Sequence, residues 1–208
     1  LDLQPDLICV TGDFITWKYN RYEEYAKVLG ELSAAAPTFA CLGNHDGGTW
    51  AEGKMKLGNG DSREVRELLE AANITLLHNE HTTAMFHGRE INLVGVGDLW
   101  NRECEPGKAF AGIDTSRPTV LLSHNPDTKD ELLAHPWQLM LSGHTHGGQL
   151  YLPGLGAPLA PVKNKKFVRG LHQLSSRGDR WLYISKGVGN LHGVRLNCRP
   201  EVALLTLA

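Results

Sequence analysis

Residues 141–148 read Leu-Ser-Gly-His-Thr-His-Gly-Gly and close a strand-like apolar stretch. They place His144 and His146 one residue apart, with Gly143 before them and two glycines after them. On an extended backbone, side chains two residues apart point the same way, so both imidazoles can face one pocket. The glycines permit the tight turns and close backbone approach that such a pocket needs. The stretch therefore predicts a strand that ends in metal-ligating histidines.

Three other apolar runs of the chain end in the same way. Each is followed within a few residues by a polar side chain that can bind a metal: residues 7–10 lead to Asp13, residues 39–42 to Asn44, and residues 120–123 to His124. In an open α/β sheet the carboxyl ends of the strands form the ligand-binding edge, so endings far apart in sequence can converge there. The pattern predicts an α/β fold with one site at that edge.

The four strand endings offer a mixed set of oxygen and nitrogen ligands. Such a set suits Mn²⁺, Fe²⁺ or Zn²⁺, and the absence of a Cys from all four endings argues against a thiolate zinc site. Taken singly, Asp13 could begin a turn, Asn44 could be a turn residue, and His124 could be a core histidine bonded to a carbonyl. Their occurrence together favours a metal site.

The same endings carry a family resemblance. Four segments resemble, in order and spacing, four of the five signature blocks of the calcineurin-like metallophosphoesterases: Gly12-Asp13, Gly43-Asn44-His45-Asp46, His124, and Gly143-His144-Thr145-His146. The resemblance covers nearly the whole chain and implies an α/β/β/α sandwich, in which two mixed sheets are flanked by helices. Residues 186–190 and 195–202 further resemble a bacterial branch of the family that contains the phosphodiesterases YaeI and YkuE.

The resemblance implies two divalent metal ions as cofactors, with Mn²⁺ favoured and iron or Zn²⁺ as alternatives. Asp13 would bridge the two ions. Asn44, His124 and His144 would complete the shell of one ion, and His146 would bind the other.

It also implies the catalytic roles of His45 and Asp46. His45, which is not a ligand in the family, would protonate the leaving oxygen or stabilise the charge that develops on it, and Asp46 would hold the tautomer of His45. The two ions would clamp the oxygens of an anionic ester and lower the pKa of a bridging water, giving in-line hydrolysis without a covalent enzyme intermediate. No Walker loop or Gly-x-Ser-x-Gly elbow competes with this interpretation.

The sequence departs from the family at its start. The first signature block, an Asp-x-His, should precede Gly12-Asp13 by some tens of residues, but only twelve residues stand before Asp13. Either the chain is an N-terminally truncated metallophosphoesterase domain spanning residues 1–208, or its site is half-built. We favour truncation, because residues 3–6 resemble a helix-to-strand connection and no initiator Met is present.

Three functions follow from these expectations. The first is a phosphodiesterase that uses a dinuclear site and metal-bound hydroxide, and the resemblance implies a nucleotide-linked lipid as its substrate. The second is a phosphomonoesterase on the same scaffold. The third is a non-catalytic binding module with an incomplete metal site, against which stands the retention of His45. The branch is bacterial, and its members often carry an N-terminal membrane anchor or export signal, so a cytoplasmic or membrane-associated protein is expected.

The chain of 208 residues has a near-neutral net charge of −2, so its overall charge does not indicate nucleic-acid binding. A local basic run contains Lys163, Lys165, Lys166 and Arg169. It is slightly more typical of a solvated loop than of a functional surface. If it borders the site, it would attract an anionic substrate or the head groups of an acidic membrane, allowing peripheral membrane contact.

Hydrophobic periodicity predicts helices over residues 22–35 and 62–72, the second with Asp61 as its N-cap. Strands are predicted at residues 82–86, 91–96, 149–152, 181–185 and 202–207. Residues 50–60 would form a lid or substrate loop, and residues 98–100 would reach the edge of the site. The first half is thus βαβ in type, and the second half is rich in strands.

Overall fold

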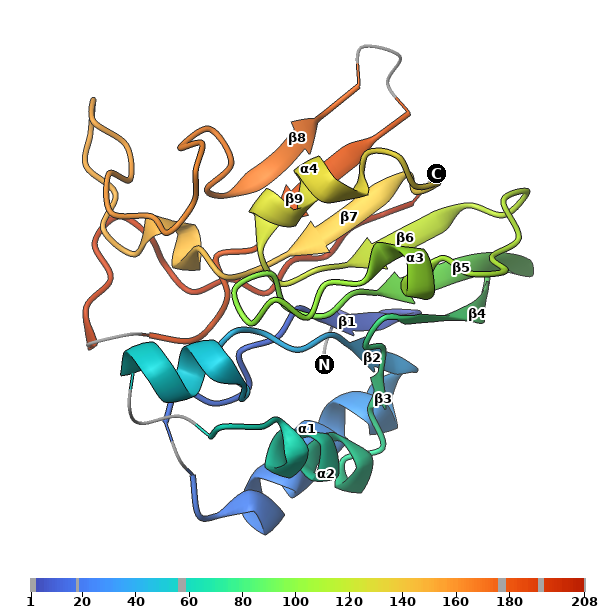
Figure 1. Cartoon of the computed structure of the whole chain (residues 1–208), viewed down its shortest axis with the longest axis horizontal. Coiled ribbons are helices and arrows are strands. Elements are labelled where there is room, and N and C mark those ends of the chain that lie inside the picture. The colour runs from blue at the N-terminus through green and yellow to red at the C-terminus, as the bar shows by residue number, and fades with distance from the viewer. Residues whose placement is uncertain (1–2, 18, 56–58, 176–178, 191–192, 208) are drawn as a thin grey trace.

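The computed structural model describes residues 3–17, 19–55, 59–175, 179–190 and 193–207. Its elements form layers that Figure 1 shows from bottom to top: two helices, a small sheet, a large sheet, and short helices with long loops. In this described part, no helix is both long enough and apolar enough to cross a membrane.

The small sheet alternates strands with helices. Its strands are β1 (Ile8–Val10), β2 (Thr38–Ala40) and β3 (Thr75–Leu76), which are all parallel. The connections contain α1 (Tyr22–Ala35) and α2 (Arg63–Ala71), with the π-helical turn η1 (Ala51–Met55) ahead of α2. The buried faces of both helices pack on this sheet in one apolar core, as expected for amphipathic helices that cross over a parallel sheet.

The large sheet has six strands in the order β4 (Glu80–Phe86), β5 (Arg89–Gly95), β6 (Thr119–Leu122), β7 (Leu139–Ser142), β9 (Trp181–Ile184) and β8 (Gly170–Gln173). The four central strands are parallel, and β4 and β8 run antiparallel at the two edges. The outer face carries α3 (Pro106–Ala109) and α4 (Lys129–Leu132), and 3-10 turns lie at η2 (Pro126–Thr128) and η3 (His146–Gly148).

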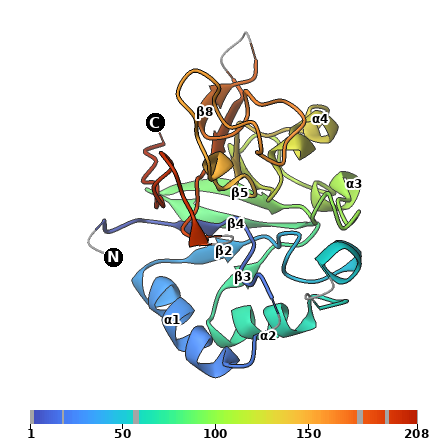
Figure 2. The same ribbon diagram turned by 90° about the vertical axis from the view of Figure 1, so that its left-hand side faces the viewer.

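Neighbouring residues of the large sheet face opposite layers. Leu93 and Leu122 pack between the two sheets with Phe39 of β2. Val94 and Leu121 face the other way and pack in the core beneath α3 and α4. Because side chains alternate along a strand, the sheet has two apolar faces and is covered on both. Figure 2 shows the resulting stack from the side.

The register of the strands brings the ligand-bearing ends to one edge. Val10 pairs with Ala40 in the small sheet, and Leu122 pairs with Leu141 in the large sheet. The chain therefore leaves β1, β2, β6 and β7 at the same end of the sandwich, as expected for parallel strands.

The predicted α/β architecture, with two facing sheets and flanking helices, is confirmed. The large sheet is mixed and the small sheet is entirely parallel. Both predicted helices are present, although α2 begins at Arg63 and Ser62 rather than Asp61 is its N-cap. Asp61 instead accepts a hydrogen bond from the backbone N–H of Arg63 (3.0 Å).

Two predicted strands are wrong. Gly147, Gly148 and Gln149 have positive φ values, which turn the chain out of the sheet at the start of residues 149–152. Isolated bridges at Leu150 and Leu152 take the place of a strand. Residues 202–207 form no strand, and Val202 is largely exposed. The structure adds the short strands β3 and β8, whose patterns were too brief to predict.

Candidate metal centre

The loops after β1 and β2 are held in direct contact. Gly12 has a φ of 84°, and a Cβ atom at this position would lie 2.4 Å from the backbone N of Gly43. Only glycine fits such an approach. It sets Asp13, with a φ of 60°, beside the Asn44 loop. The backbone N–H of His45 donates to Asp13 Oδ1 (3.0 Å), which couples the two loops again.

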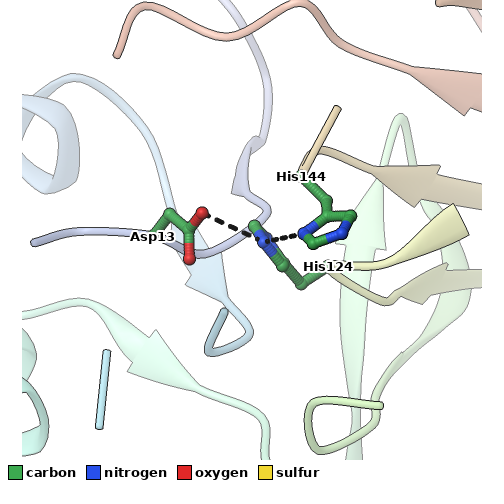
Figure 3. Close-up of side chains that lie close together, drawn as sticks. All are labelled: Asp13, His124 and His144. Carbon is green, nitrogen blue, oxygen red and sulfur yellow. Dashed lines mark hydrogen bonds and ion pairs between the residues drawn. The ribbon is translucent and has the colours of Figure 1, made fainter. Parts of the chain in front are cut away.

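Three side chains from different strand ends form a compact cluster. The ligand atoms of Asp13, His124 and His144 lie within 4.8 Å of one another (Figure 3). His124 Nε2 is 3.2 Å from Asp13 Oδ2 and 3.2 Å from His144 Nδ1. Asn44 joins them, with its Oδ1 2.8 Å from His144 Nδ1. The structure thus brings together four of the five predicted metal ligands.

Backbone carbonyls fix which ring nitrogens face this cluster. His124 Nδ1 lies 2.5 Å from the carbonyl oxygen of Thr11, and His144 Nε2 lies 3.2 Å from that of Pro161. A carbonyl oxygen only accepts, so both of these nitrogens carry a proton. A neutral ring then directs the lone pair of its other nitrogen into the cluster, the arrangement that metal-ligating histidines adopt.

The donor set therefore fits a divalent cation. Two imidazole lone pairs, the carboxylate of Asp13 and the amide oxygen of Asn44 converge, all acceptors at contact distance. Acceptors this close repel one another unless a proton or a cation lies among them. Mixed oxygen and nitrogen ligands suit Mn²⁺, iron or Zn²⁺.

The charges of the cluster are strongly coupled. Burial disfavours the charged form of His124, but the Asp13 carboxylate outweighs burial and raises the pKa of His124 to about 9. Burial and the proximity of His124 lower the pKa of His144 to about 3. Burial would raise the pKa of Asp13, yet His124 and the other histidines hold it well below its usual range. In the metal-free chain a proton on His124 therefore takes the place of the cation.

His146 is placed apart from this cluster. It is not among the clustered ligand atoms, and its backbone has a φ of 51°. Its Nδ1 is buried and, among the described residues, has no hydrogen-bond partner. Burial lowers the pKa of His146, so the ring is neutral. A buried imidazole nitrogen without a partner is available to a second ion.

Asp46 has different partners from those predicted. Its carboxylate accepts hydrogen bonds from the backbone N–H groups of Asp13, Phe14, Ile15 and Gly43, at 2.6 to 3.2 Å. The ring of His45 is instead oriented by the carbonyl oxygen of Thr16, 3.4 Å from His45 Nδ1. The prediction that Asp46 holds the tautomer of His45 is therefore wrong, because the loop amides occupy its carboxylate. Asp46 fixes the loop that carries Asp13.

Aromatic side chains border the cluster on one side. The Trp100 ring packs edge-on against His144, with 4.3 Å between ring centroids, and Trp50 lies between Trp100 and His45. Asn101 anchors this wall, since its Oδ1 accepts from the backbone N–H of Trp50 (2.9 Å). Residues 98–100 thus reach the site edge as predicted. The lid over residues 50–60 stays a prediction, and residues 56–58 lie outside the described part.

Asp98 is a member of this neighbourhood that the sequence analysis did not assign. It is buried, its Oδ1 accepts from the backbone N–H of Asn101 (2.8 Å), and its Oδ2 has no partner among the described residues. Burial raises its pKa, and the proximity of His124 opposes this effect. The sequence signal that could have identified Asp98 is the Gly97-Asp98 pair, which directly follows the predicted strand at residues 91–96.

Comparison with known proteins agrees with this geometry. Residues 1–148 match the family model described as calcineurin-like phosphoesterase. The chain belongs to the calcineurin-like phosphoesterase family. Membership of this family implies divalent metal ions, and the chain is a phosphoester hydrolase rather than a non-catalytic binding module.

The relatives of this phosphoesterase include characterised bacterial proteins. It is 42% identical over 208 residues to phosphodiesterase YaeI of Escherichia coli, covering 100% of this chain and 72% of the relative. It is 30% identical over 244 residues to UDP-2,3-diacylglucosamine pyrophosphatase LpxG of Chlamydia muridarum, covering 98% of this chain and 74% of the relative. The uncharacterized metallophosphoesterase YkuE of Bacillus subtilis is 28% identical over 208 residues, covering 98% of this chain and 68% of the relative. The predicted family and bacterial branch are confirmed.

Proposed function

We propose that this phosphoesterase cleaves a phosphoric ester or anhydride that joins a nucleotide to a lipid. The observation that carries the proposal is the convergence of Asp13, Asn44, His124 and His144 beside His45, an ion site next to a proton donor. The proposal that one side of the substrate is a lipid is supported by the similarity to a pyrophosphatase named for UDP-2,3-diacylglucosamine.

In this proposal Asp13, Asn44, His124 and His144 would hold one ion, and Asp13 and His146 would contribute to holding a second. Mn²⁺ is the ion we favour, with iron and Zn²⁺ as alternatives. When bound, the two ions neutralise phosphate oxygens and lower the pKa of a water. The support for His146 is its buried Nδ1, which lacks a partner among the described residues.

The chain's own residues supply the remaining steps. The Thr16 carbonyl and the Trp50 ring hold the imidazole of His45, and protonated His45 would give its proton to the leaving oxygen. Trp100 and Trp50 shield one side of the site from water, which strengthens electrostatic interactions inside it. We further propose that residues 1–208 belong to a single metallophosphoesterase domain, because both sheets contribute ligands.

A cleft beside the cluster favours a diester over a monoester. Its volume is about 510 Å³, and its lining includes Leu99, Trp100, Pro161 and Val162. Two of these residues contact His144: Trp100 packs on the His144 ring, and the Pro161 carbonyl accepts from His144 Nε2. A terminal phosphate would leave this cleft empty, whereas a second ester arm would fill it.

We expect the Mn²⁺-loaded chain to hydrolyse bis-p-nitrophenyl phosphate at least about tenfold more efficiently than p-nitrophenyl phosphate, which corresponds to about 1.4 kcal/mol. Release of UMP from UDP-2,3-diacylglucosamine would identify the lipid substrate. The comparison is of kcat/KM for the three compounds under one condition. A preference for the monoester would instead support the phosphomonoesterase alternative.

Metal binding should depend on pH in a defined direction. Because the pKa of His124 is raised to about 9, the metal-free chain holds a proton there at neutral pH, and the ion must displace it. The apparent Mn²⁺ affinity should therefore fall about tenfold for each pH unit below 9. Calorimetry at pH 7.5 in buffers of different ionisation enthalpy should show release of about one proton per ion. An affinity that is independent of pH would contradict this assignment of His124.

A further inference from the structure

Charge is distributed very unevenly along this near-neutral chain. Residues 132–200 contain nine Lys and Arg but only one acidic residue, Asp179. The remaining residues contain twelve Lys and Arg and twenty-two Asp and Glu. Such asymmetry within one chain is typical of proteins that bind an anionic polymer or membrane on one face.

Two loops of this basic part lie side by side. Tyr151 N–H donates to the Leu196 carbonyl and Leu196 N–H donates to the Gln149 carbonyl, both at 2.9 Å. The guanidinium of Arg195 binds the carbonyls of Lys186 (2.9 Å) and Gly187 (3.2 Å). We name residues 149–169, 186–190 and 193–199, which these hydrogen bonds hold together, the loop face. Figure 1 shows both segments at the left of the view, the orange one above the red one.

The loop face exposes large apolar side chains. Leu155 is 67% exposed, Leu159 73% and Val188 67%, and Val194 and Leu196 are also exposed. Leu155 lies at the tip of a tight turn, which the Leu152 N–H closes by donating to the Gly156 carbonyl (2.7 Å). Exposed apolar side chains concentrated on one surface mark an interaction site.

Basic side chains lie in the same segments as these apolar residues. Lys163, Lys166 and Arg199 are exposed, and Arg169 lies over the Tyr151 ring at 3.7 Å from its centroid. Neither segment of the loop face contains an Asp or Glu. Apolar groups that can enter the head-group layer, in segments with basic but no acidic side chains, complement an anionic lipid surface.

The loop face is continuous with the metal centre. The cleft beside His144 is lined by Leu99 and Trp100 on one side and by Pro161, Lys163 and Lys165 of the loop face on the other. A surface that bound the loop face would therefore lie at the mouth of the site.

We propose that the loop face docks this phosphoesterase onto an anionic lipid bilayer, with Leu155, Leu159 and Val188 entering the head-group layer. The benefit to catalysis rests on the proposed function, since docking would bring a lipid-anchored ester into the cleft. The binding itself depends only on apolar area and charge.

Co-sedimentation with lipid vesicles tests the proposal without any substrate. The chain should bind vesicles of phosphatidylglycerol and phosphatidylethanolamine, less well at high salt, and should bind phosphatidylcholine vesicles weakly. The Leu155→Ser/Leu159→Ser pair and the Lys166→Gln/Arg199→Gln pair, none of whose residues lines the cleft, should each lower partitioning about tenfold or more. The matched control is Val28→Ser/Met85→Ser, whose residues are 61% and 67% exposed on α1 and β4, away from the loop face.

Two outcomes would overturn the proposal. One is no binding to anionic vesicles, which is expected if an acidic protein or another chain segment covers this surface. The other is an equal loss of vesicle binding in the control pair. The loop-face variants should keep their turnover of bis-p-nitrophenyl phosphate, which shows that they fold and that the site is intact. If vesicle binding holds but no nucleotide-linked lipid is cleaved, the proposed function fails while the docking surface stands.

Discussion

Replacing His144 by alanine is expected to remove the tightly bound metal and abolish phosphodiester hydrolysis. His144 contributes one of four converging ligand atoms and contacts both His124 and Asn44, so its loss opens the shell. Loss of an outer-shell partner alone typically lowers metal affinity 10- to 100-fold, so loss of a ligand should exceed about 100-fold. Elemental analysis after Mn²⁺ loading and desalting measures the effect.

Two further variants separate ligand loss from other causes. His144 has a φ of 66°, which strains alanine, so His144→Gly removes the ring while suiting the backbone. It should lose the metal equally. His87→Asn changes an exposed histidine in the β4–β5 turn that pairs with Asp6, and it should keep the wild-type metal content. Full metal content in His144→Gly would contradict the assigned site.

Replacing His45 by alanine should lower the turnover of an alkyl phosphodiester about 10²- to 10⁴-fold while leaving the metal content nearly unchanged. The ring of His45 is oriented by the Thr16 carbonyl and by Trp50 rather than by the metal cluster. Its backbone N–H, which binds Asp13 Oδ1, is kept in the variant. The measurement is kcat at saturating substrate beside metal analysis of the same sample.

The leaving group shows whether His45 donates a proton. An ester of p-nitrophenol leaves readily as an anion, so His45→Ala should slow it little. An ester of an alkyl alcohol needs a proton on its leaving oxygen, so it should lose most of its rate. Equal losses for both esters would assign His45 to charge stabilisation, and loss of metal would make it a structural residue of the site.

The sequence predicted the part of the site that depends on residue type and spacing. Asp13, Asn44, His124 and His144 each follow a short apolar run, and parallel strands then determine that they meet. What orients the two histidines could not be predicted, because the carbonyls of Thr11 and Pro161 belong to the backbone and carry no sequence signal.

The predictions for Asp46 and for residues 149–152 were wrong for a different reason, namely contacts and backbone angles that the local sequence does not determine. Asp46 was predicted to contact its neighbour in sequence, but four backbone amides of two loops bind it instead, because a carboxylate can accept from several donors at once. The strand predicted at residues 149–152 had a suitable apolar pattern. The positive φ values of Gly147, Gly148 and Gln149 overrode it, and those angles depend on tertiary contacts.

The left-handed backbone at Asp13, His144 and His146 means that the metal centre lowers the stability of the folded chain. For residues with a side chain this conformation is unfavourable by about 1 kcal/mol or more each, against a typical net stability of only about 5–15 kcal/mol. Glycine at any of the three positions would relieve that strain and destroy the site. Selection for thermostability alone should therefore enrich glycine at these positions, and a stabilised variant of this chain should be examined there first for lost activity.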